Sequence, residues 1–215
     1  MDVTTRDAAV DEWMRALSES TGSPGGGAGA GVMLAIAASL TSMVAGYSEP
    51  APGDEGTLEA ILDRSHALRE DALDLADEDS TASKAFGAAF RLTKGEERDE
   101  AIRHASIAAA ETSAALGSRA VEAIGDLAWL GEHGNRSLVA DVVVACGALR
   151  AAIAGARTNV SFDLGTLTST GKTLAQVQDD NPALWASVKR FDDGLARIDR
   201  MAAALDPRAA PTDAA

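Results

Sequence analysis

The sequence is poor in cysteine and in aromatic residues, and both shortages restrict the fold. Its 215 residues include one cysteine, Cys146, which excludes an intramolecular disulfide framework and a zinc site built on several cysteines. Phe, Trp and Tyr together make up 4% of the chain, whereas 46 residues are alanine. Strands favour aromatic and β-branched residues, and alanine is the best helix former. The composition therefore predicts an all-α protein, and the single thiol favours a cytoplasmic location.

Positive charge is also scarce. Lys and Arg number 19 against 33 Asp and Glu, so the formal net charge is −14 and the sequence pI is about 4.5. A general nucleic-acid binder needs a basic surface, and so does a protein that docks on anionic membranes, so this balance argues against both. The hydrophobic share of 46% is sufficient for one core. We expect a single domain over residues 1–205 and a disordered tail over residues 206–215.

A charge-free run over residues 28–47 has two interpretations, a buried helix or a membrane span. Its twenty residues are enough to cross a bilayer. However, Ala, Gly, Ser and Thr fill most of the run, and no Lys/Arg cluster or aromatic belt flanks it. We therefore favour the central helix of a bundle and expect no membrane association. The first fifteen residues are acidic and lack a basic segment before an apolar one, which argues against a signal peptide.

Apolar residues at helical spacing predict helices along most of the chain, separated by short turns rich in Gly, Pro and Ser. Short turns make neighbouring helices antiparallel, so we expect an antiparallel bundle of about six to eight helices with one Ala/Gly-rich buried helix. Two helices carry so few charges that we also expect a homodimer interface. The expected helices cover residues 7–19, 28–47, 58–92 (unbroken, or broken near 77–80), 97–130 (with a possible interruption at Gly117), 138–156 and 173–205 (with a break at Asn181–Pro182), and residues 159–171 look irregular.

A glycine run gives the strongest local signal for a binding site. Pro24, Gly25, Gly26 and Gly27 lead directly into the charge-free helix. Unpaired N–H groups at a helix N-terminus bind anions, and glycine lets a ligand approach the backbone. The other interpretation is close helix packing, because Gly27 and Gly31 are four residues apart, as are Gly25 and Gly29. The residues alone leave both interpretations open.

Aspartates in apolar surroundings are the second signal. Asp141 lies in the segment LVADVVVACGAL, where a buried carboxylate needs a partner or a function. Arg150 and Arg157 are its candidate structural partners, although Arg157 and Asn159 could instead cap the C-terminus of that helix. Asp79 lies in a charged run and, taken alone, would be solvated. The three histidines, His66, His104 and His133, do not have the spacing of metal ligands, so no metal site is expected.

The order of these segments resembles the cyclodeaminase/cyclohydrolase family. That family contains the C-terminal domain of formiminotransferase-cyclodeaminase and the bacterial methenyltetrahydrofolate cyclohydrolase. The resemblance covers residues 7–170 and rests on five segments in order: the Ser-x-x-x-Pro-Gly-Gly-Gly loop, Asp79-Ser80-x-Ala82, Gly134-Asn135, the Asp141 helix and Ala156-Arg157-x-Asn159-Val160. It implies an all-helical homodimer that binds a folate in a cleft near the dimer interface.

The resemblance also implies chemistry at the N5,N10-methenyl bridge of tetrahydrofolate, with no further cofactor. Asp79 and Asp141 become the candidate catalytic carboxylates, because the methenyl group is a cation and its hydrolysis needs a general base and acid. The expected substrate-binding residues are Pro24, Gly25, Gly26, Gly27, Arg157 and Asn159. The expected reaction is hydrolysis of 5,10-methenyltetrahydrofolate to 10-formyltetrahydrofolate. The alternatives are release of ammonia from 5-formimidoyltetrahydrofolate, or a degenerate member that binds a ligand or partner without catalysis.

The degenerate alternative is based on polar positions at which this chain departs from the family pattern. Ala28 stands where a serine usually follows the three glycines, and Ser83 replaces an aromatic residue. Ala140 stands where a serine commonly precedes the second aspartate. Asp163 falls in Phe162-Asp163-Leu164, where the family has an asparagine-containing stretch. Groups that would orient a ligand or water in the family are therefore changed here.

Overall fold

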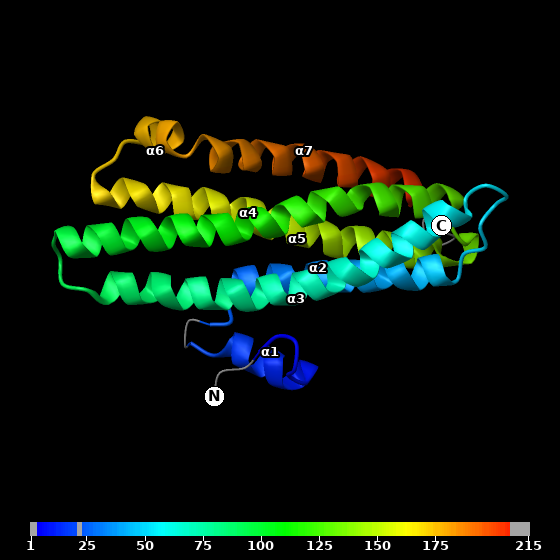
Figure 1. The fold of residues 1–215 in the computed structure, drawn as a ribbon, viewed down its shortest axis with the longest axis horizontal. Helices are drawn as coiled ribbons and strands as arrows, with labels where there is room; N and C mark the ends of the chain where they lie inside the picture. The colour runs from blue at the N-terminus through cyan, green and yellow to red at the C-terminus, as the bar shows by residue number, and fades with distance from the viewer. Residues whose placement is uncertain (1–3, 21–22, 207–215) are drawn as a thin grey trace, which may run out of the picture.

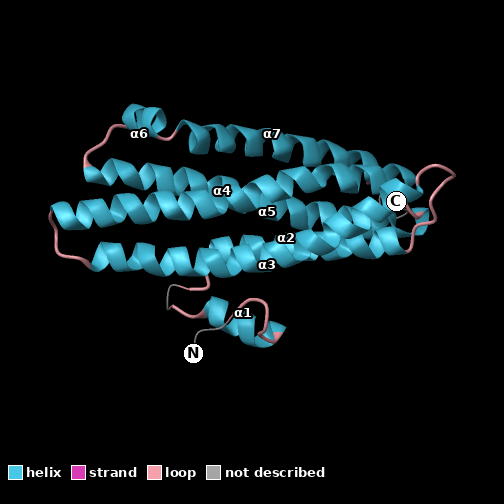
Figure 2. Ribbon diagram, viewed as in Figure 1, coloured by secondary structure: helices cyan, strands magenta, loops and turns pink. Residues whose placement is uncertain are grey.

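The computed structural model describes residues 4–20 and 23–206. This part of the chain is helical and contains no strand (Figure 2). Of the expected tail over residues 206–215, residues 207–215 lie outside the described residues. The helices are α1 (Val10–Ser18), α2 (Gly26–Gly46), α3 (Glu55–Arg91), α4 (Glu96–His133), α5 (Val139–Thr166), α6 (Leu174–Asp180) and α7 (Pro182–Leu205), with 3₁₀ turns at Arg136–Leu138 and Leu167–Thr170.

Four long helices, α2 to α5, form an antiparallel bundle (Figure 1). Within it α2 packs on α3 and α5, and α4 packs on α3 and α5. The α7 helix covers the α4–α5 side, whereas α1 lies against the opposite side, next to α2 and α3. The expected all-α bundle, including its number of helices, is confirmed.

Small residues let α2 pack closely on both of its neighbours. A Cβ atom on Gly31 would lie 2.8 Å from Cβ of Ala76 on α3, and one on Gly155 of α5 would lie 2.9 Å from Cβ of Ala30. These distances are shorter than carbon atoms tolerate, so each contact requires a glycine. The Ala/Gly-rich run is therefore a central bundle helix. Both α2 and the segment that contains α5 are nevertheless long and apolar enough to span a bilayer by length and composition, and 56% and 39% of their apolar windows are buried.

The structure decides two alternatives that the sequence left open, at residues 77–80 and at Gly117, and corrects the expected end of α5. The α3 helix continues through residues 77–80, since that tract has charge but no Gly or Pro to stop it. The α4 helix continues through Gly117, which packs against Phe191 and Ala156. Residues 159–166 are helical and extend α5 by about ten residues beyond the expected end. The expected break at Asn181–Pro182 is confirmed, with Pro182 in the first turn of α7.

The α2 helix begins well short of its neighbours, and this offset creates the candidate site. At that end of the bundle α3, α4 and α5 all extend beyond the first residue of α2 (Figure 1). The loop before α2 lies on α3, where the Ser23 hydroxyl donates a 3.2 Å hydrogen bond to the Ser80 carbonyl. The glycine run is thereby held against the segment of α3 that carries Asp79.

Candidate functional site

Asp79 lies directly against the N-terminus of α2. Its side chain is 6% exposed, and its carboxylate occupies the space that a side chain on Gly27 would need. A Cβ atom there would lie 2.6 Å from Oδ2 and closer still to Oδ1. The N-cap residue of α2 is Gly25, which has no side chain to cap the helix. Asp79 fills that role from another helix, because it accepts a hydrogen bond from the N–H of Ala28.

Burial raises the pKa of the Asp79 carboxyl above its usual value of 3.8. The Ala28 N–H and the Ser83 hydroxyl oppose this increase because they favour the charged form. Within the described part of the chain, Oδ2 of Asp79 is buried and has no hydrogen-bond partner. Burying a carboxylate oxygen without a hydrogen-bond partner costs free energy. A proton on Asp79, or a hydrogen-bond donor from a ligand, would remove that cost.

Asn159 and Asp163 bring α5 to the same point. The two residues are four apart on one helix face, and Asn159 lines a crevice with Asp79 and Gly27. Burial and the nearby Asp79 carboxylate together raise the pKa of Asp163 from 3.8 to about 7. Sequence reasoning treated Asp163 only as a departure from the family pattern. The four-residue spacing from Asn159 was the signal that could have placed it in the site.

The α4 helix contributes hydroxyl groups on the third side. Thr112 and Ser113 line the crevice together with Asp79 and Asn159. Ser106 lies two turns before Ser113 on the same helix face, and its fully buried hydroxyl has no hydrogen-bond partner among the described residues. The crevice itself has no room for a water-sized sphere. A ligand would therefore meet Asp79 and Asp163 from the end of the bundle that α2 leaves uncovered.

The glycine run combines the two interpretations offered by its sequence. The N-terminus of α2 does hold an anion, but that anion is the chain's own Asp79. Gly27 and Gly31 are required by close packing on α3, whereas Gly25, Gly26 and Gly29 have open space where a Cβ atom would lie. Pro24 is buried beside them. The exposed Gly26 is thus the residue of this run that remains available to a ligand.

Asp141 does not join this site within one protomer. It lies in the first turn of α5, and Asp163 lies 22 residues later, which is about 33 Å along the helix axis. Asp141 is half-buried, so it is not the buried carboxylate that its apolar flanking residues suggest. Its expected partners are engaged elsewhere, since Arg150 pairs with Asp199 at 2.6 Å and Arg157 pairs with Asp192 at 2.9 Å. A carboxylate in the first turn is instead stabilised by the helix dipole.

Arg157 also lies apart from Asp79. Its guanidinium group faces α7, where Asp192 binds it. Because α5 continues to Thr166, neither Arg157 nor Asn159 caps its C-terminus. Of the two, only Asn159 is near the Asp79 carboxylate.

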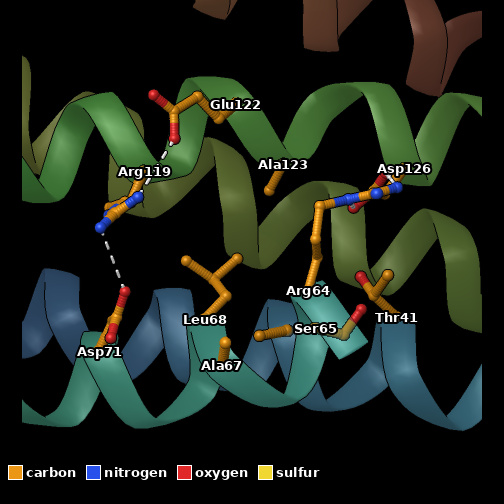
Figure 3. Close-up of a pocket in the computed structure, with 11 residues that line it drawn as sticks. Thr41, Arg64, Ser65, Ala67, Leu68, Asp71, Arg119, Glu122, Ala123 and Asp126 are labelled. Carbon is orange, nitrogen blue, oxygen red and sulfur yellow. Dashed lines mark hydrogen bonds and ion pairs between the residues drawn. The ribbon is translucent and has the colours of Figure 1, made fainter. Parts of the chain in front are cut away.

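A second hollow of about 170 Å³ lies between α3 and α4 (Figure 3). Its charged side chains bind one another. Arg64 pairs with Asp126 at 2.7 Å, and Arg119 lies 3.4 Å from Asp71 and 3.7 Å from Glu122. The pairs with Asp126 and Asp71 link α3 to α4, whereas the pair with Glu122 lies within α4. Because these charges are paired, the buried Asp79 with its unpartnered oxygen is the better candidate for chemistry.

Neither the thiol nor a metal cluster provides an alternative centre in the described residues. Burial raises the pKa of Cys146 to about 11, which keeps it as an unreactive thiol. Residues 4–20 and 23–206 contain no group of three or more His, Cys, Asp or Glu side chains that could hold a metal ion.

Comparison with known proteins identifies the family of the chain. The formiminotransferase-cyclodeaminase family matches residues 9–178, a range that includes Asp79, Asn159 and Asp163. The chain belongs to this family. It is 28% identical over 170 residues to the formimidoyltransferase-cyclodeaminase of Rattus norvegicus. It is also 28% identical over 159 residues to the methenyltetrahydrofolate cyclohydrolase of Methylorubrum extorquens.

The matches differ in how much of each relative they cover. The alignments include 75% of this chain but 31% of the rat enzyme, and 70% of this chain and 76% of the bacterial one. The formiminotetrahydrofolate cyclodeaminase of Thermotoga maritima has the same fold, with a TM-score of 0.78 and 21% identity over 93% of this chain and 96% of that one. The family's all-helical bundle thus extends over nearly the whole of this chain.

Proposed function

We propose that this family member hydrolyses 5,10-methenyltetrahydrofolate to 10-formyltetrahydrofolate. The observation that carries the proposal is the buried Asp79 carboxylate, with an unpartnered oxygen, at the uncovered end of α2. The methenyl bridge is a delocalised cation, and a carboxylate held in a low-dielectric position favours such a cation and the charge that moves during its hydrolysis. Asp163 supplies a second carboxyl, with a pKa of about 7, that titrates near neutral pH.

Substrate contacts are proposed for the residues around the pair. Asn159 can orient the folate through its amide, and the backbone of Gly26 is open to a ligand. Pro24, Gly25 and Gly27 shape the loop, with Gly27 leaving room for the carboxylate. Arg157 is a weaker candidate because Asp192 already binds it. No cofactor beyond the folate is proposed.

The second candidate activity is release of ammonia from 5-formimidoyltetrahydrofolate. The rat relative supports this activity, because its name includes cyclodeaminase. Its sequence identity to this chain, 28%, equals that of the bacterial cyclohydrolase. The bridged folate is the product of this reaction and the substrate of the hydrolysis, and both reactions need proton transfer at a nitrogen bonded to the bridge carbon. A carboxyl pair can serve either one, so the substrate decides between them.

A second copy of the chain is proposed to cover the outward face of α5. The exposed residues of this helix from 140 to 162 are uncharged except for Arg150, which pairs with Asp199. Val144 is 59% exposed and Phe162 is 75% exposed. An apolar face of this length on a chain of net charge −14 suits a symmetric partner, since two acidic copies can meet only where neither is charged. Phe162 adjoins Asp163, so this interface would border the site.

We propose a cytoplasmic homodimer, supported by the free buried Cys146 and by this apolar face. Light scattering at micromolar concentration should give twice the chain mass, and Val144→Arg should reduce it to one chain. Ala186→Arg, on the exposed surface of α7, is the matched control and should remain dimeric. A wild-type chain that stays monomeric would contradict the dimer.

The activity is tested by assaying both folates with the purified chain. Loss of the methenyl chromophore beyond the uncatalysed rate would support hydrolysis, and ammonia release from the formimidoyl compound would support the second candidate. A thermal-shift titration with the same folates measures binding separately, because a true ligand raises the melting temperature by mass action. Stabilisation without turnover of either compound would identify a member that binds folate without catalysis.

A further inference from the structure

We propose that the hollow between α3 and α4 binds a small zwitterionic amino acid, with the ligand carboxylate on Arg119 and the ligand ammonium group on Asp71. This site is separate from the candidate folate site. Asp71 precedes Asp79 by eight residues, which is about 12 Å along the axis of α3. The inference goes beyond the proposed folate chemistry and does not depend on it.

Two arginines line the hollow, and their ion pairs differ in geometry. Arg64 of α3 donates two hydrogen bonds to Asp126, at 3.0 Å from Nε and 2.7 Å from Nη2. This bidentate arrangement uses both oxygens of the carboxylate. Arg119 of α4 lies 3.4 Å from Asp71 and 3.7 Å from Glu122, and it makes no hydrogen bond among the described residues. Its N–H donors are therefore available to a ligand.

The charges around Arg119 favour a ligand that carries both signs. Asp71 faces Arg119 from α3, and Glu122 lies on its other side (Figure 3). A ligand with only a carboxylate would meet two negative charges, and one with only an ammonium group would meet the guanidinium. An α-amino acid places both groups on one carbon atom, so its carboxylate can bind Arg119 while its ammonium group binds Asp71.

The ligand would replace the direct ion pair between Arg119 and Asp71 with a bridge between the two helices. Both side chains are about half exposed, at 54% and 46%. Exposed ion pairs contribute little to stability, so opening this one costs little. Each charged group then gains a closer partner than it has in the empty hollow.

The rest of the lining limits the size and polarity of the ligand. Leu68 and Ala123 lie between the two arginines (Figure 3). The Thr41 and Ser65 hydroxyls are buried and donate to carbonyls of their own helices at 2.8 and 2.6 Å, so they offer the hollow only acceptor lone pairs. The volume of about 170 Å³ is smaller than that of sites for drug-sized molecules. We therefore expect an amino acid with a short, mostly apolar side chain.

The first test compares three ligands on the unmodified chain by NMR titration. L-Alanine carries both charged groups, propionate lacks the ammonium group, and ethylamine lacks the carboxylate. A ligand of about six non-hydrogen atoms suits a Kd of about 1 mM for L-alanine, and we expect the other two to bind at least about tenfold more weakly. No saturable shift with L-alanine up to about 20 mM, or equal affinity for propionate, would overturn the proposal.

The second test locates the ligand carboxylate. Arg119→Gln should weaken L-alanine binding at least about tenfold, because it removes the bidentate donor. Arg103→Gln is the matched control, since Arg103 lies on the same helix and pairs with Glu100 outside the hollow. It should bind L-alanine as the wild type does, and melting temperatures establish that both variants are folded. Wild-type affinity in Arg119→Gln, or an equal loss in both variants, would overturn the site.

The third test locates the ligand ammonium group through a change of opposite sign for two ligands. Asp71→Asn should weaken L-alanine binding severalfold, because it removes the charge that the ammonium group binds. The same variant should bind propionate more tightly, because it removes a negative charge beside Arg119. Changes in the same direction for both ligands would overturn the placement of the ammonium group on Asp71. None of these titrations uses a folate, so failure here and failure of the proposed hydrolysis are separate results.

Discussion

The two aspartates that the sequence singles out end in opposite situations at opposite ends of the bundle. Asp79, in a run of charges, is buried under the first turn of α2 with an unpartnered oxygen. Asp141, in a run of valines, is half-buried in the first turn of α5. Flanking residues describe the neighbours along one helix, but burial is set by the helices packed beside it. The contrast shows that Asp79 is buried because the first turn of another helix, α2, packs on it.

The largest expected effect is on turnover after the Asp79 carboxylate is replaced. Asp79→Asn keeps an acceptor for the Ala28 N–H and removes the charge of the carboxylate. We expect kcat/KM to fall by about 10²–10⁴-fold, the usual contribution of a positioned proton-transfer group. Circular dichroism and the melting temperature establish that the variant is folded. Turnover within a factor of two of wild type would show that the chemistry lies elsewhere.

The second largest expected effect is on the free energy of unfolding, when either of two glycines in the same turn of α2 is replaced by alanine. Gly27→Ala forces a methyl group into the Asp79 carboxylate, and we expect a loss of about 1–3 kcal/mol in unfolding free energy, together with loss of activity. Gly29→Ala is the matched control, because nothing lies within 4 Å of its Cβ position. Alanine inside a helix is favoured over glycine, so this variant should gain about 0.5–1 kcal/mol.

Urea denaturation of both variants measures the comparison directly. Equal changes for Gly27→Ala and Gly29→Ala would mean that the Asp79 carboxylate is not seated on Gly27. A destabilised Gly27→Ala with full activity would separate the packing of this turn from its function.

The sequence predicted the fold well because helix periodicity and turn composition are local properties. Pro182 begins α7 as expected, and the glycine run begins the buried helix within two residues of the expected start. The site was less predictable because its parts come from three helices. The family resemblance points to Asp79 and Asn159, but it gives Asp163 only as a departure from the family pattern. Only the packing of α5 on the end of α2 makes Asp163 a neighbour of Asp79.

The same distinction explains the two errors at α5. The sequence predicts that α5 ends near residue 156, and the following segment contains Thr158, Asn159 and Gly165, which have low helix propensity. Burial of Val160 and Leu164 in the core overrides that propensity and continues the helix. The partner expected for Asp141 was sought among arginines on α5, but those arginines point to acidic residues on α7. Ion-pair choice depends on which helices adjoin, and helical spacing alone does not contain that information.

The smallest expected effect is that of Asp141→Asn. This substitution tests the other member of the comparison between Asp79 and Asp141. The charge of Asp141 interacts with the N-terminus of α5, which is worth about 0.3–1 kcal/mol at low ionic strength and is screened by salt. We expect a loss of that size in dilute buffer, a smaller one in 1 M NaCl, and unchanged turnover. A loss of about 3–5 kcal/mol would instead reveal a broken buried pair. Lost turnover with unchanged stability would mean that a second copy brings its own α5 start to Asp79, because about 33 Å separates the two ends of this helix within one protomer. Measuring both quantities on the same preparation therefore decides whether Asp141 belongs to the helix dipole or to a site shared between copies.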